Sequence, residues 1–196
     1  YMKKVVPHDA ILIPDLAERK FEGIIFDTYQ WSQELFDGTT VTFEMLRRPD
    51  TVSVMCIVDG KILVLKDEQP HSGIRVNFPG GRVDLSDEDI ETAAKREVHE
   101  ETGYSFNKWK LLNVYQPQSK NEWFIHLYLA WDVVSVEVPH TDAGEKIDVE
   151  KYSFEEVKNL ANDNPNVANE MQPILRVNSV EDLKNAPAFI GKEVIR

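Results

Sequence analysis

Three glutamates stand close together near the end of a predicted helix. They are Glu97, Glu100 and Glu101, and the run closes at Gly103. Carboxylates at i,i+4 on a helix repel each other, so soluble helices usually separate them or pair them with cations. Clustered carboxylate oxygens are the ligands that hard cations such as Mg²⁺ or Mn²⁺ prefer. The pattern therefore indicates a divalent metal site, with a solvated acidic helix end as the simpler alternative.

The helix that carries these glutamates is predicted over residues 88–102. Ser86 followed by Asp89 is typical of a capping box, and Gly103 provides a stop. At about 100° per residue, one face of this helix changes from apolar to acidic; its members are Ile90, Ala93, Ala94, Glu97 and Glu101. The glutamates are thus expected at the edge of a contact between the helix and a sheet, which a solvated surface explains less well.

The segment from residue 81 to residue 104 resembles the Nudix box, whose pattern is Gly, five residues, Glu, seven residues, then Arg-Glu-apolar-x-Glu-Glu-x-Gly-apolar. The matching residues are Gly81, Glu88, Arg96, Glu97, Val98, Glu100, Glu101, Gly103 and Tyr104. Six residues, not five, separate Gly81 from Glu88. Because the spacing from Glu88 to Arg96 is kept, we expect the extra residue in the loop at residues 84–87, away from the helix.

Nudix enzymes hydrolyse the diphosphate of a nucleoside diphosphate linked to another group. An anionic diphosphate repels a nucleophile unless metal ions neutralise its oxygens, so the resemblance implies Mg²⁺ as the cofactor, with Mn²⁺ as an alternative. The expected ligands are the carbonyl of Gly80 and the side chains of Glu97, Glu100 and Glu101. Arg96 and Glu88 are expected to hold the loop and the helix together by hydrogen bonds.

The general base is less sharply defined by the sequence. In the ADP-ribose pyrophosphatase branch of the family it often comes from an acidic loop well after the box, and residues 140–146 form such a loop here. Glu145 is the first candidate, Asp142 the second and Glu122 the third. A glutamate of the box could act instead, and any one of these acids could be a solvated surface group.

Two N-terminal runs, residues 26–34 and 43–49, resemble the extra β-segment of the ADP-ribose and nucleotide-sugar pyrophosphatases. In that branch the segment exchanges between two subunits, and its aromatic side chains can stack on the nucleobase. Strand alternation puts Tyr29 and Trp31 on one face, where they form either a stacking platform or a core or dimer contact. The resemblance therefore predicts a homodimer and a nucleotide-sugar substrate such as ADP-ribose.

Two arginines are candidate phosphate contacts, Arg47 beside the N-terminal segment and Arg75 in the loop before the box. Residues 76–81 differ from the Glu-x-Pro-Ala-Gly that usually precedes the box in this branch. The substrate prediction therefore covers other nucleotide sugars as well as ADP-ribose.

The order of the predicted strands and helices indicates an α+β or layered α/β/α domain. The resemblance implies that this domain is an α/β/α sandwich of the Nudix fold with an N-terminal antiparallel β-segment. The expected organisation is an N-terminal β-segment at residues 1–48, a hydrolase domain at 49–163 and a C-terminal packing segment at 164–196. The resemblance implies that the N-terminal segment can exchange between the subunits of a dimer. Two hairpins are predicted from Asp-Gly turns at Asp37-Gly38 and Asp59-Gly60. Further strands are expected near residues 109–115, 123–134 and 147–153, and a second helix near 154–162.

Composition narrows the possible partners. The net charge is −12, and Arg47-Arg48 is the most evident basic cluster, so binding to a nucleic acid is not expected. No run reaches the roughly 20 apolar residues of a membrane span. The single cysteine, Cys56, lies in an apolar run, which fits a buried thiol and a cytoplasmic protein.

Two other functions fit the same box. A Nudix-fold module could bind a nucleotide as a regulator without hydrolysing it, although such modules typically lose box glutamates that are all present here. A housecleaning enzyme could instead act on damaged nucleoside triphosphates. The long N-terminal β-segment argues against that alternative, because compact housecleaning members lack one.

Overall fold

The computed structural model of the chain describes residues 2–69, 72–140, 146–163 and 168–196. In chain order its elements are β1 (Lys3–Val6), β2 (Glu18–Phe21), β3 (Asp27–Glu34), β4 (Thr40–Arg47), β5 (Thr51–Val58), β6 (Lys61–Gln69), β7 (Ser72–Asn77), α1 (Ile90–Thr102), β8 (Tyr104–Tyr115), β9 (Asn121–Glu122), β10 (Ile125–Val136), β11 (Lys146–Tyr152), α2 (Phe154–Asp163), α3 (Ala168–Leu175), α4 (Val180–Asn185) and β12 (Lys192–Ile195).

The central sheet has the strand order β11-β6-β5-β10-β8, and β7 pairs with β6. β5 and β10 run parallel, and the other neighbouring strands run antiparallel. β5 is a nearly continuous apolar run because both of its faces are covered. Within the part of the chain that the structure describes, no helix is long and apolar enough to cross a bilayer.

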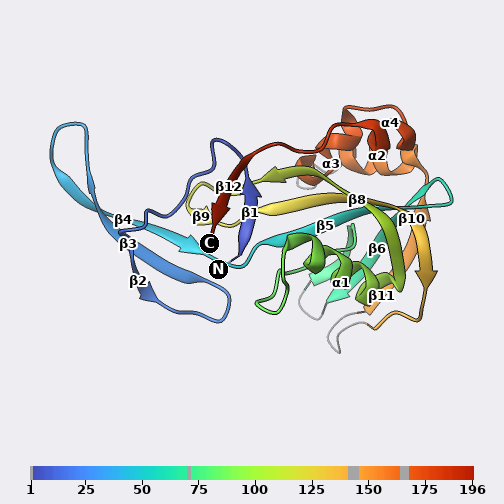
Figure 1. The fold of residues 1–196 in the computed structure, drawn as a ribbon, viewed down its shortest axis with the longest axis horizontal. Helices are drawn as coiled ribbons and strands as arrows, with labels where there is room; N and C mark the ends of the chain where they lie inside the picture. The colour runs from blue at the N-terminus through green and yellow to red at the C-terminus, as the bar shows by residue number, and fades with distance from the viewer. Residues whose placement is uncertain (1, 70–71, 141–145, 164–167) are drawn as a thin grey trace.

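Side chains of β5 alternate between two hydrophobic cores. Val52, Val54 and Cys56 pack with the apolar face of α1, whereas Met55 and Ile57 pack on the other side with residues of α2, α3 and α4. Figure 1 shows α1 on one side of the sheet and the other helices on the opposite side. The predicted α+β fold with helices on both faces is confirmed.

Both predicted hairpins are confirmed. β5 and β6 pair across Asp59 and Gly60, which both have positive φ, as a tight turn between twisted antiparallel strands requires. β3 and β4 pair in full register and turn at Gly38, with φ 80°. β2, β3 and β4, residues 18–47, form an arm that extends away from the central sheet (Figure 1).

The start of α1 differs from its prediction. The helix begins at Ile90, and its N-cap is Asp89, whose carboxylate accepts a hydrogen bond from Thr92 N at 2.7 Å. Ser86 is exposed in the preceding loop and does not cap the helix. The loop instead folds on itself, because Asp87 N donates to the Asp84 carbonyl at 3.2 Å. The C-terminal stop is confirmed: Gly103 adopts the left-handed conformation and donates to the His99 carbonyl.

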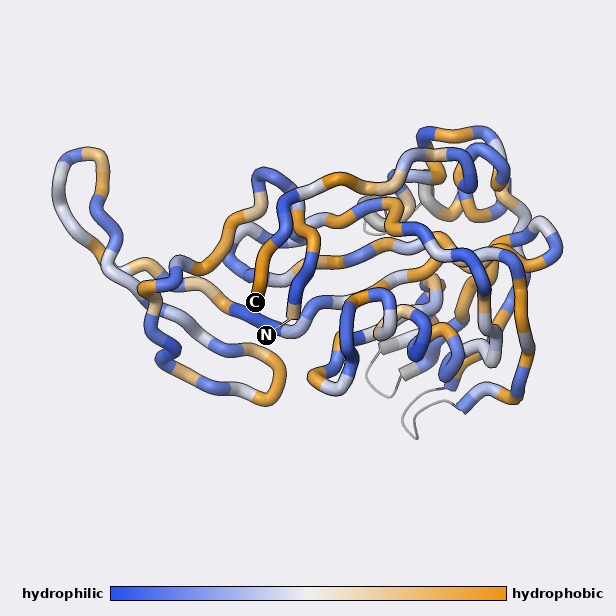
Figure 2. The backbone as a smooth tube through the Cα atoms, viewed as in Figure 1, coloured by the Kyte–Doolittle hydropathy of each residue, from blue (hydrophilic) through white to orange (hydrophobic). Residues whose placement is uncertain are grey.

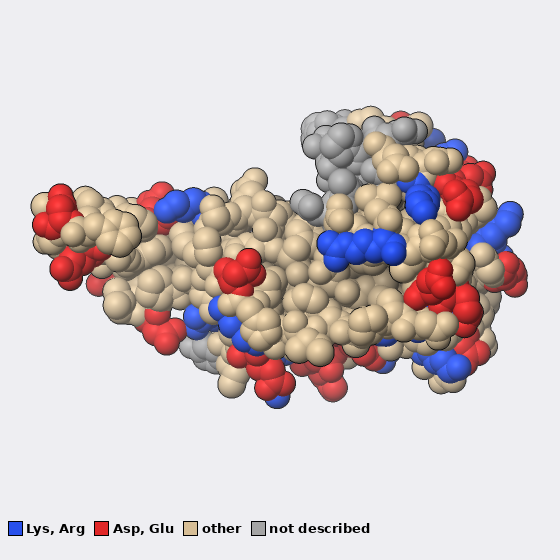
Figure 3. All heavy atoms as spheres, turned by 90° about the horizontal axis from the view of Figure 1, so that it is seen from above, with Lys and Arg blue, Asp and Glu red and all other residues tan. Residues whose placement is uncertain are grey.

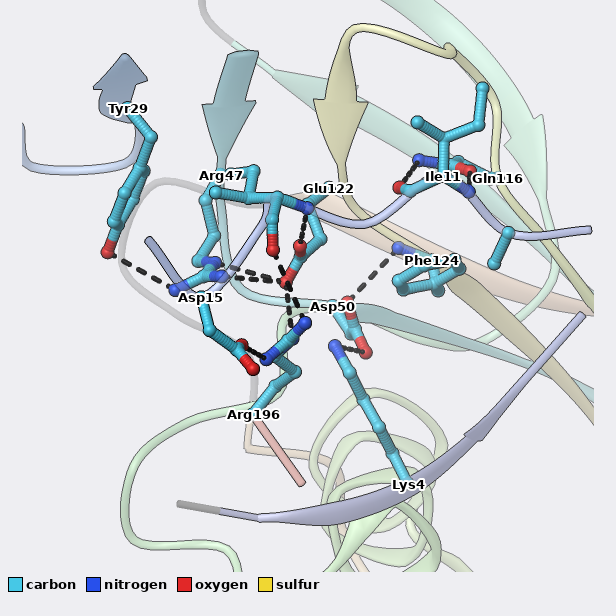
Figure 4. A network of polar contacts seen from close by, with 12 residues as sticks. Lys4, Ile11, Asp15, Tyr29, Arg47, Asp50, Gln116, Glu122, Phe124 and Arg196 are labelled. Atoms are coloured by element: carbon cyan, nitrogen blue, oxygen red, sulfur yellow. Dashed lines mark hydrogen bonds and ion pairs between the residues drawn. The ribbon is translucent and has the colours of Figure 1, made fainter. Parts of the chain in front are cut away.

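A network of buried charges ties the two ends of the chain to the core (Figure 4). β1 pairs with β12, and the side chain of Glu122 in the same network is 1% exposed. Its carboxylate lies 3.0 Å from Arg47 Nη2 and 3.4 Å from Arg196 Nε, and it accepts a hydrogen bond from Ile13 N at 2.6 Å. Three segments distant in sequence therefore share one buried carboxylate.

A second buried carboxylate, that of Asp50, holds β1 against the core. Lys4 Nζ donates to Asp50 Oδ2 at 2.6 Å, His126 Nε2 lies 3.0 Å from the same oxygen, and Phe124 N donates to Oδ1 at 3.1 Å. Burial acts to raise the pKa of Asp50, but the hydrogen bond to His126 and the charge of Lys4 outweigh it and hold that pKa below its ordinary value. The carboxylate is therefore charged in the folded protein.

The pairing of Asp50 makes stability depend on pH. Since the folded-state pKa of Asp50 lies below its ordinary value of 3.8, its contribution is complete above that value and is lost as pH falls through the folded pKa. We expect Asp50→Asn to lower the free energy of unfolding at neutral pH by about 3 kcal/mol and to reduce the acid-induced loss of stability. Urea unfolding of both proteins at a series of acidic pH values measures this.

Asp15→Asn serves as the control, because Asp15 is highly exposed and its ion pair with Arg196 is expected to contribute little. Stability curves for the wild type and Asp50→Asn that run parallel throughout the acid range would contradict the assignment.

Candidate active site

A glycine turn at residues 79–81 lies directly against the first residues of β5. Val54 N donates to the Pro79 carbonyl at 2.7 Å, and Val52 N donates to the Gly81 carbonyl at 2.9 Å. Gly80 has φ 153°, and a Cβ on it would lie 2.1 Å from the Val52 carbonyl oxygen. Only glycine fits this close approach, so the turn is fixed to the strand by its backbone.

The acidic end of α1 packs on this glycine turn. A Cβ on Gly81 would lie 2.6 Å from the carboxylate of Glu97, so the absence of a side chain makes room for that group. Glu101 Oε2 accepts a hydrogen bond from Gly80 N at 2.7 Å. Two of the three glutamates are thus placed against the turn, as the periodicity of the helix predicts.

Arg96 binds two of the three glutamates. Its Nη1 donates to Glu97 Oε1 at 2.9 Å and to Glu100 Oε2 at 3.1 Å. Burial raises the pKa of Glu97 to about 7, although the charge of Arg96 acts in the opposite direction. Arg96 therefore compensates part of the repulsion that the sequence leaves between the carboxylates.

The partner of Arg96 in the loop is Asp87, not Glu88. Arg96 Nε and Nη2 donate to the two oxygens of Asp87 at 3.1 and 3.0 Å, a bidentate pair. These hydrogen bonds lower the pKa of Asp87 and raise that of Arg96. Glu88, which was expected to hold the loop and the helix together along with Arg96, is exposed, and its role stays a prediction.

The position of the extra residue in the box changes accordingly. Gly81 and Asp87 are separated by five residues, the family spacing, so the insertion follows the acid instead of preceding it. Asp87 is shorter than the usual glutamate, and the extra residue lies between it and Arg96. The spacing of Gly81 and Asp87 was the sequence signal that could have identified the pair.

The donors around the glycine turn fit a hard divalent cation. Glu97, Glu100 and Glu101 supply carboxylate oxygens. The carbonyls of Pro79 and Gly81 accept hydrogen bonds from β5, and the Gly80 carbonyl lies between them in the chain. Among the described residues no three His, Cys, Asp or Glu side chains converge as a ready-made metal cage. The reason is visible in the contacts: Glu97 and Glu100 face Arg96, and Glu101 faces Gly80 N.

Two of the three candidates for the general base lie outside the described residues, namely Asp142 and Glu145. The residue before them is placed next to the site, because His140 N donates to the Glu100 carbonyl at 2.8 Å. The third candidate, Glu122, has a 1% exposed side chain and is ion-paired with Arg47 and Arg196 (Figure 4), which argues against this role.

Of the predicted substrate contacts, the structure brings Tyr29 and Arg47 together. Tyr29 receives a hydrogen bond from Arg47 Nη1 at 3.2 Å, and its ring is stacked by that guanidinium at 4.6 Å. Trp31 packs against Phe43 within the arm. Arg75 is exposed on β7, opposite Asp67 on β6. Arg47 itself is bound to Glu122, so its charge is already paired.

Sequence reasoning missed a second arginine, Arg48, and the indole that supports it. The guanidinium of Arg48 lies 4.5 Å from the centre of the Trp123 ring and 5.5 Å from that of Phe26. These residues come from separate segments, and no local pattern predicts that they meet. Charges on the face shown in Figure 3 are otherwise scattered, with Lys and Arg lying singly among acidic and uncharged groups.

Comparisons with known proteins agree with this geometry. A model of the NUDIX domain matches residues 47–173. An ADP-ribose pyrophosphatase of Bacillus subtilis (strain 168) is 30% identical over 147 residues, which are 73% of this chain and 79% of that protein. A methanol dehydrogenase activator of Bacillus methanolicus is 30% identical over 118 residues, 58% of this chain and 63% of that protein.

A crystal structure of an ADP compounds hydrolase has a similar fold. It superposes with a TM-score of 0.66 at 19% identity and covers 94% of this chain and 96% of its own. The domain match spans more than half of the chain and includes the glycine turn, α1 and all strands of the central sheet. The chain therefore belongs to the Nudix family.

Proposed function

We propose that the protein is a pyrophosphatase that hydrolyses a nucleoside diphosphate linked to another group, with ADP-ribose or another nucleotide sugar as substrate. Water adds to one phosphorus, the diphosphate bond breaks, and a nucleoside monophosphate and a sugar phosphate leave. The observation that carries the proposal is the contact of Glu97 and Glu101 with a glycine turn bound to β5. The name of the Bacillus subtilis relative, ADP-ribose pyrophosphatase, supports the substrate class.

The proposed cofactor is Mg²⁺, with Mn²⁺ as the alternative. Glu97, Glu100, Glu101 and the Gly80 carbonyl would hold it. Bound there, the ion would neutralise diphosphate oxygens and lower the pKa of water. Arg96 would stay fixed to the loop through Asp87 and the Arg82 carbonyl, the latter at 3.0 Å from Nη2, and so keep the helix and the turn in register.

For proton transfer we propose Glu145 first and Asp142 second. Support comes from the chain beside them: Glu137 N donates to the Gly103 carbonyl and His140 N to the Glu100 carbonyl, both at 2.8 Å. The segment that leads to these acids therefore begins at the acidic end of α1. A base that takes a proton from the attacking water must lie within hydrogen-bond reach of it.

Removal of two box carboxylates tests the reaction. With ADP-ribose and Mg²⁺, we expect Glu100→Gln combined with Glu101→Gln to reduce kcat by at least about a thousandfold, because loss of the cation removes the charge stabilisation it supplies. Release of AMP, followed by chromatography, measures turnover. Glu155→Gln, on the exposed side of α2, is the control for removal of a carboxylate outside the box and is expected to retain wild-type kcat.

Full turnover by a folded Glu100→Gln/Glu101→Gln protein would refute the proposal. A panel of nucleotide sugars, dinucleotides and nucleoside triphosphates, each with Mg²⁺ or Mn²⁺, separates the other functions. Nucleotide binding without cleavage would favour a regulatory module, and preferential cleavage of triphosphates would favour housecleaning.

Asp87 and Glu88 are adjacent acidic residues, so substitution of one can serve as the control for the other. We expect Asp87→Asn to lower both kcat and stability, the latter by about 2 kcal/mol, because the guanidinium of Arg96 loses its bidentate charged partner in the loop. Glu88→Gln is expected to change neither, since Glu88 is exposed. Urea unfolding and steady-state kinetics of the two variants measure this, and equal effects would show that the assignment of Asp87 is wrong.

We further propose that the protein is a homodimer joined through the arm. Large apolar side chains are exposed there: Phe21 is 62% exposed, Ile24 99% and Phe36 at least as exposed as in an extended chain. Figure 2 shows the loop between β2 and β3 as hydrophobic. A second copy of the arm would cover these groups and the free edge of β2.

Light scattering during size-exclusion chromatography tests the dimer. We expect a mass of twice 22.6 kDa for the wild type and a shift toward 22.6 kDa for Ile24→Asp with Phe21→Asp, because both changes place charge in the proposed contact. Val134→Asp is the control, since Val134 is 66% exposed on β10, outside the arm. A monomeric wild type would contradict the proposal.

A further inference from the structure

Asp50 connects three segments of the chain through its side chain and its backbone. Its carboxylate is 3% exposed and accepts hydrogen bonds from Lys4 Nζ at 2.6 Å and from Phe124 N at 3.1 Å (Figure 4). Its backbone carbonyl accepts a hydrogen bond from Val83 N at 2.9 Å. The strand β1, the residue before β10 and the segment that follows the glycine turn are therefore all bound to one residue.

The segment after the glycine turn is placed by this contact. Val83 is buried, and Thr51 pairs with Arg82, so residues 82–83 run antiparallel to residues 50–51. Two residues before Val83, Gly81 lies against the carboxylate of Glu97, where a Cβ would be only 2.6 Å away. Because this contact is so close, a small shift of residues 81–83 changes the space that is left for Glu97.

Lys4 supplies the positive charge that holds the Asp50 carboxylate. The lysine side chain is 10% exposed, and its Nζ lies 4.9 Å from the centre of the Phe124 ring. His126 Nε2 lies 3.0 Å from the same oxygen of Asp50, and its side chain is 1% exposed. A buried carboxylate without its cation is strongly unfavourable, so loss of the ammonium group forces Asp50 to move toward water or to admit water.

Two other cations near the ends of the chain provide a contrast. Lys3, the neighbour of Lys4 in β1, pairs with an acid at the surface, where both side chains are exposed. Arg196 directly follows β12 and reaches Glu122, a buried acid that a second arginine also neutralises. Of these three cations, Lys4 is the one whose acid also binds Val83.

We propose that Lys4 is a positioning residue for the hydrolysis: acting through Asp50, it fixes the backbone that follows the glycine turn and, with it, the place of Glu97. The inference rests on the proposed function and adds to it a residue far from the box in the sequence. Lys4 takes no part in proton transfer or in binding the cation. It restricts where the turn lies, and a small displacement of such a turn lowers rate and cation affinity by about 10- to 100-fold.

The test compares Lys4→Gln with Lys3→Gln, which removes the same charge from the neighbouring exposed position of β1. Three properties are measured: amide exchange at Val83 relative to amides of β6 and β11, Kd for Mn²⁺ by electron paramagnetic resonance, and the kinetics of ADP-ribose cleavage at saturating Mg²⁺. In Lys4→Gln we expect at least about tenfold faster exchange at Val83, an about tenfold higher Kd and an about tenfold lower kcat, with KM within about twofold. Lys3→Gln is expected to match the wild type in all three.

A double-mutant cycle tests whether Lys4 acts through Asp50. We expect Asp50→Asn to change exchange, Kd and kcat in the same direction as Lys4→Gln. The double variant Lys4→Gln/Asp50→Asn is expected to be no worse than the more affected single variant, because both changes remove the same contact. Fully additive effects would contradict an action through Asp50. Arg196→Gln is the control for a loosened β12, and we expect it to leave Val83 exchange and Kd unchanged.

The exchange and binding measurements separate positioning from a merely structural role. Wild-type Val83 exchange and Kd in a folded Lys4→Gln protein would overturn the proposal, as would faster exchange spread evenly over Val83, β6 and β11. Either result leaves the hydrolysis standing if the wild type releases AMP. If the wild type neither binds Mn²⁺ nor cleaves a nucleotide sugar, the proposed function falls, and exchange at Val83 still decides whether Lys4 acts on the turn. Should Lys4→Gln fail to fold, the double variant, which leaves neither charge unpaired, takes its place, and unchanged exchange and Kd there would refute the proposal.

Discussion

The backbone hydrogen bonds between β5 and the residues around the glycine turn determine where the reactive groups lie. They join Val54 to Pro79, Val52 to Gly81 and Val83 to Asp50, all within 3 Å. On one side the turn receives the carboxylates of α1, and its continuation pairs Arg82 with Thr51 at the start of β5. Because β5 is packed between two hydrophobic cores, it is a rigid base for this arrangement.

Charge balance at the site comes from the chain itself. Arg96 contacts two carboxylates of the box and is anchored in turn by Asp87, so the acidic end of α1 can fold before a cation is bound. The same logic recurs at the junction with the arm, where Glu122 is shared by Arg47 and Arg196. In both places a buried or half-buried carboxylate is stabilised by a guanidinium whose fork fits it.

The sequence predicted those features of the fold that depend on residues close together in the chain. The Asp-Gly hairpins, the C-terminal stop of α1 and its change from apolar to acidic residues all follow from turn chemistry and from the 3.6-residue period. The cap was harder to choose because Ser86 and Asp89 are both good N-cap residues. In the structure Asp89 is the N-cap, and the carboxylate of Asp87 binds Arg96 nine residues later.

Contacts between distant segments could not be predicted from one sequence. Nothing near Glu122 in the sequence indicates that it is buried, because its partners Ile13, Arg47 and Arg196 are distant in the chain. The pairing of β1 with β12 likewise joins opposite ends of the chain. Arg48 and Trp123 likewise meet only after the arm is folded onto the sheet. Charge and aromatic character are visible in the sequence, but their partners are set by topology.

The single cysteine of the chain has a practical consequence. Cys56 is fully buried between β5 and α1, and burial raises the pKa of its thiol well above the ordinary value, so little reactive thiolate forms. A cysteine introduced at Phe36, on the tip of the arm, would therefore carry a spin label or fluorophore selectively without removal of the native thiol. The natural sequence is thus already suited to measuring distances between arms in solution.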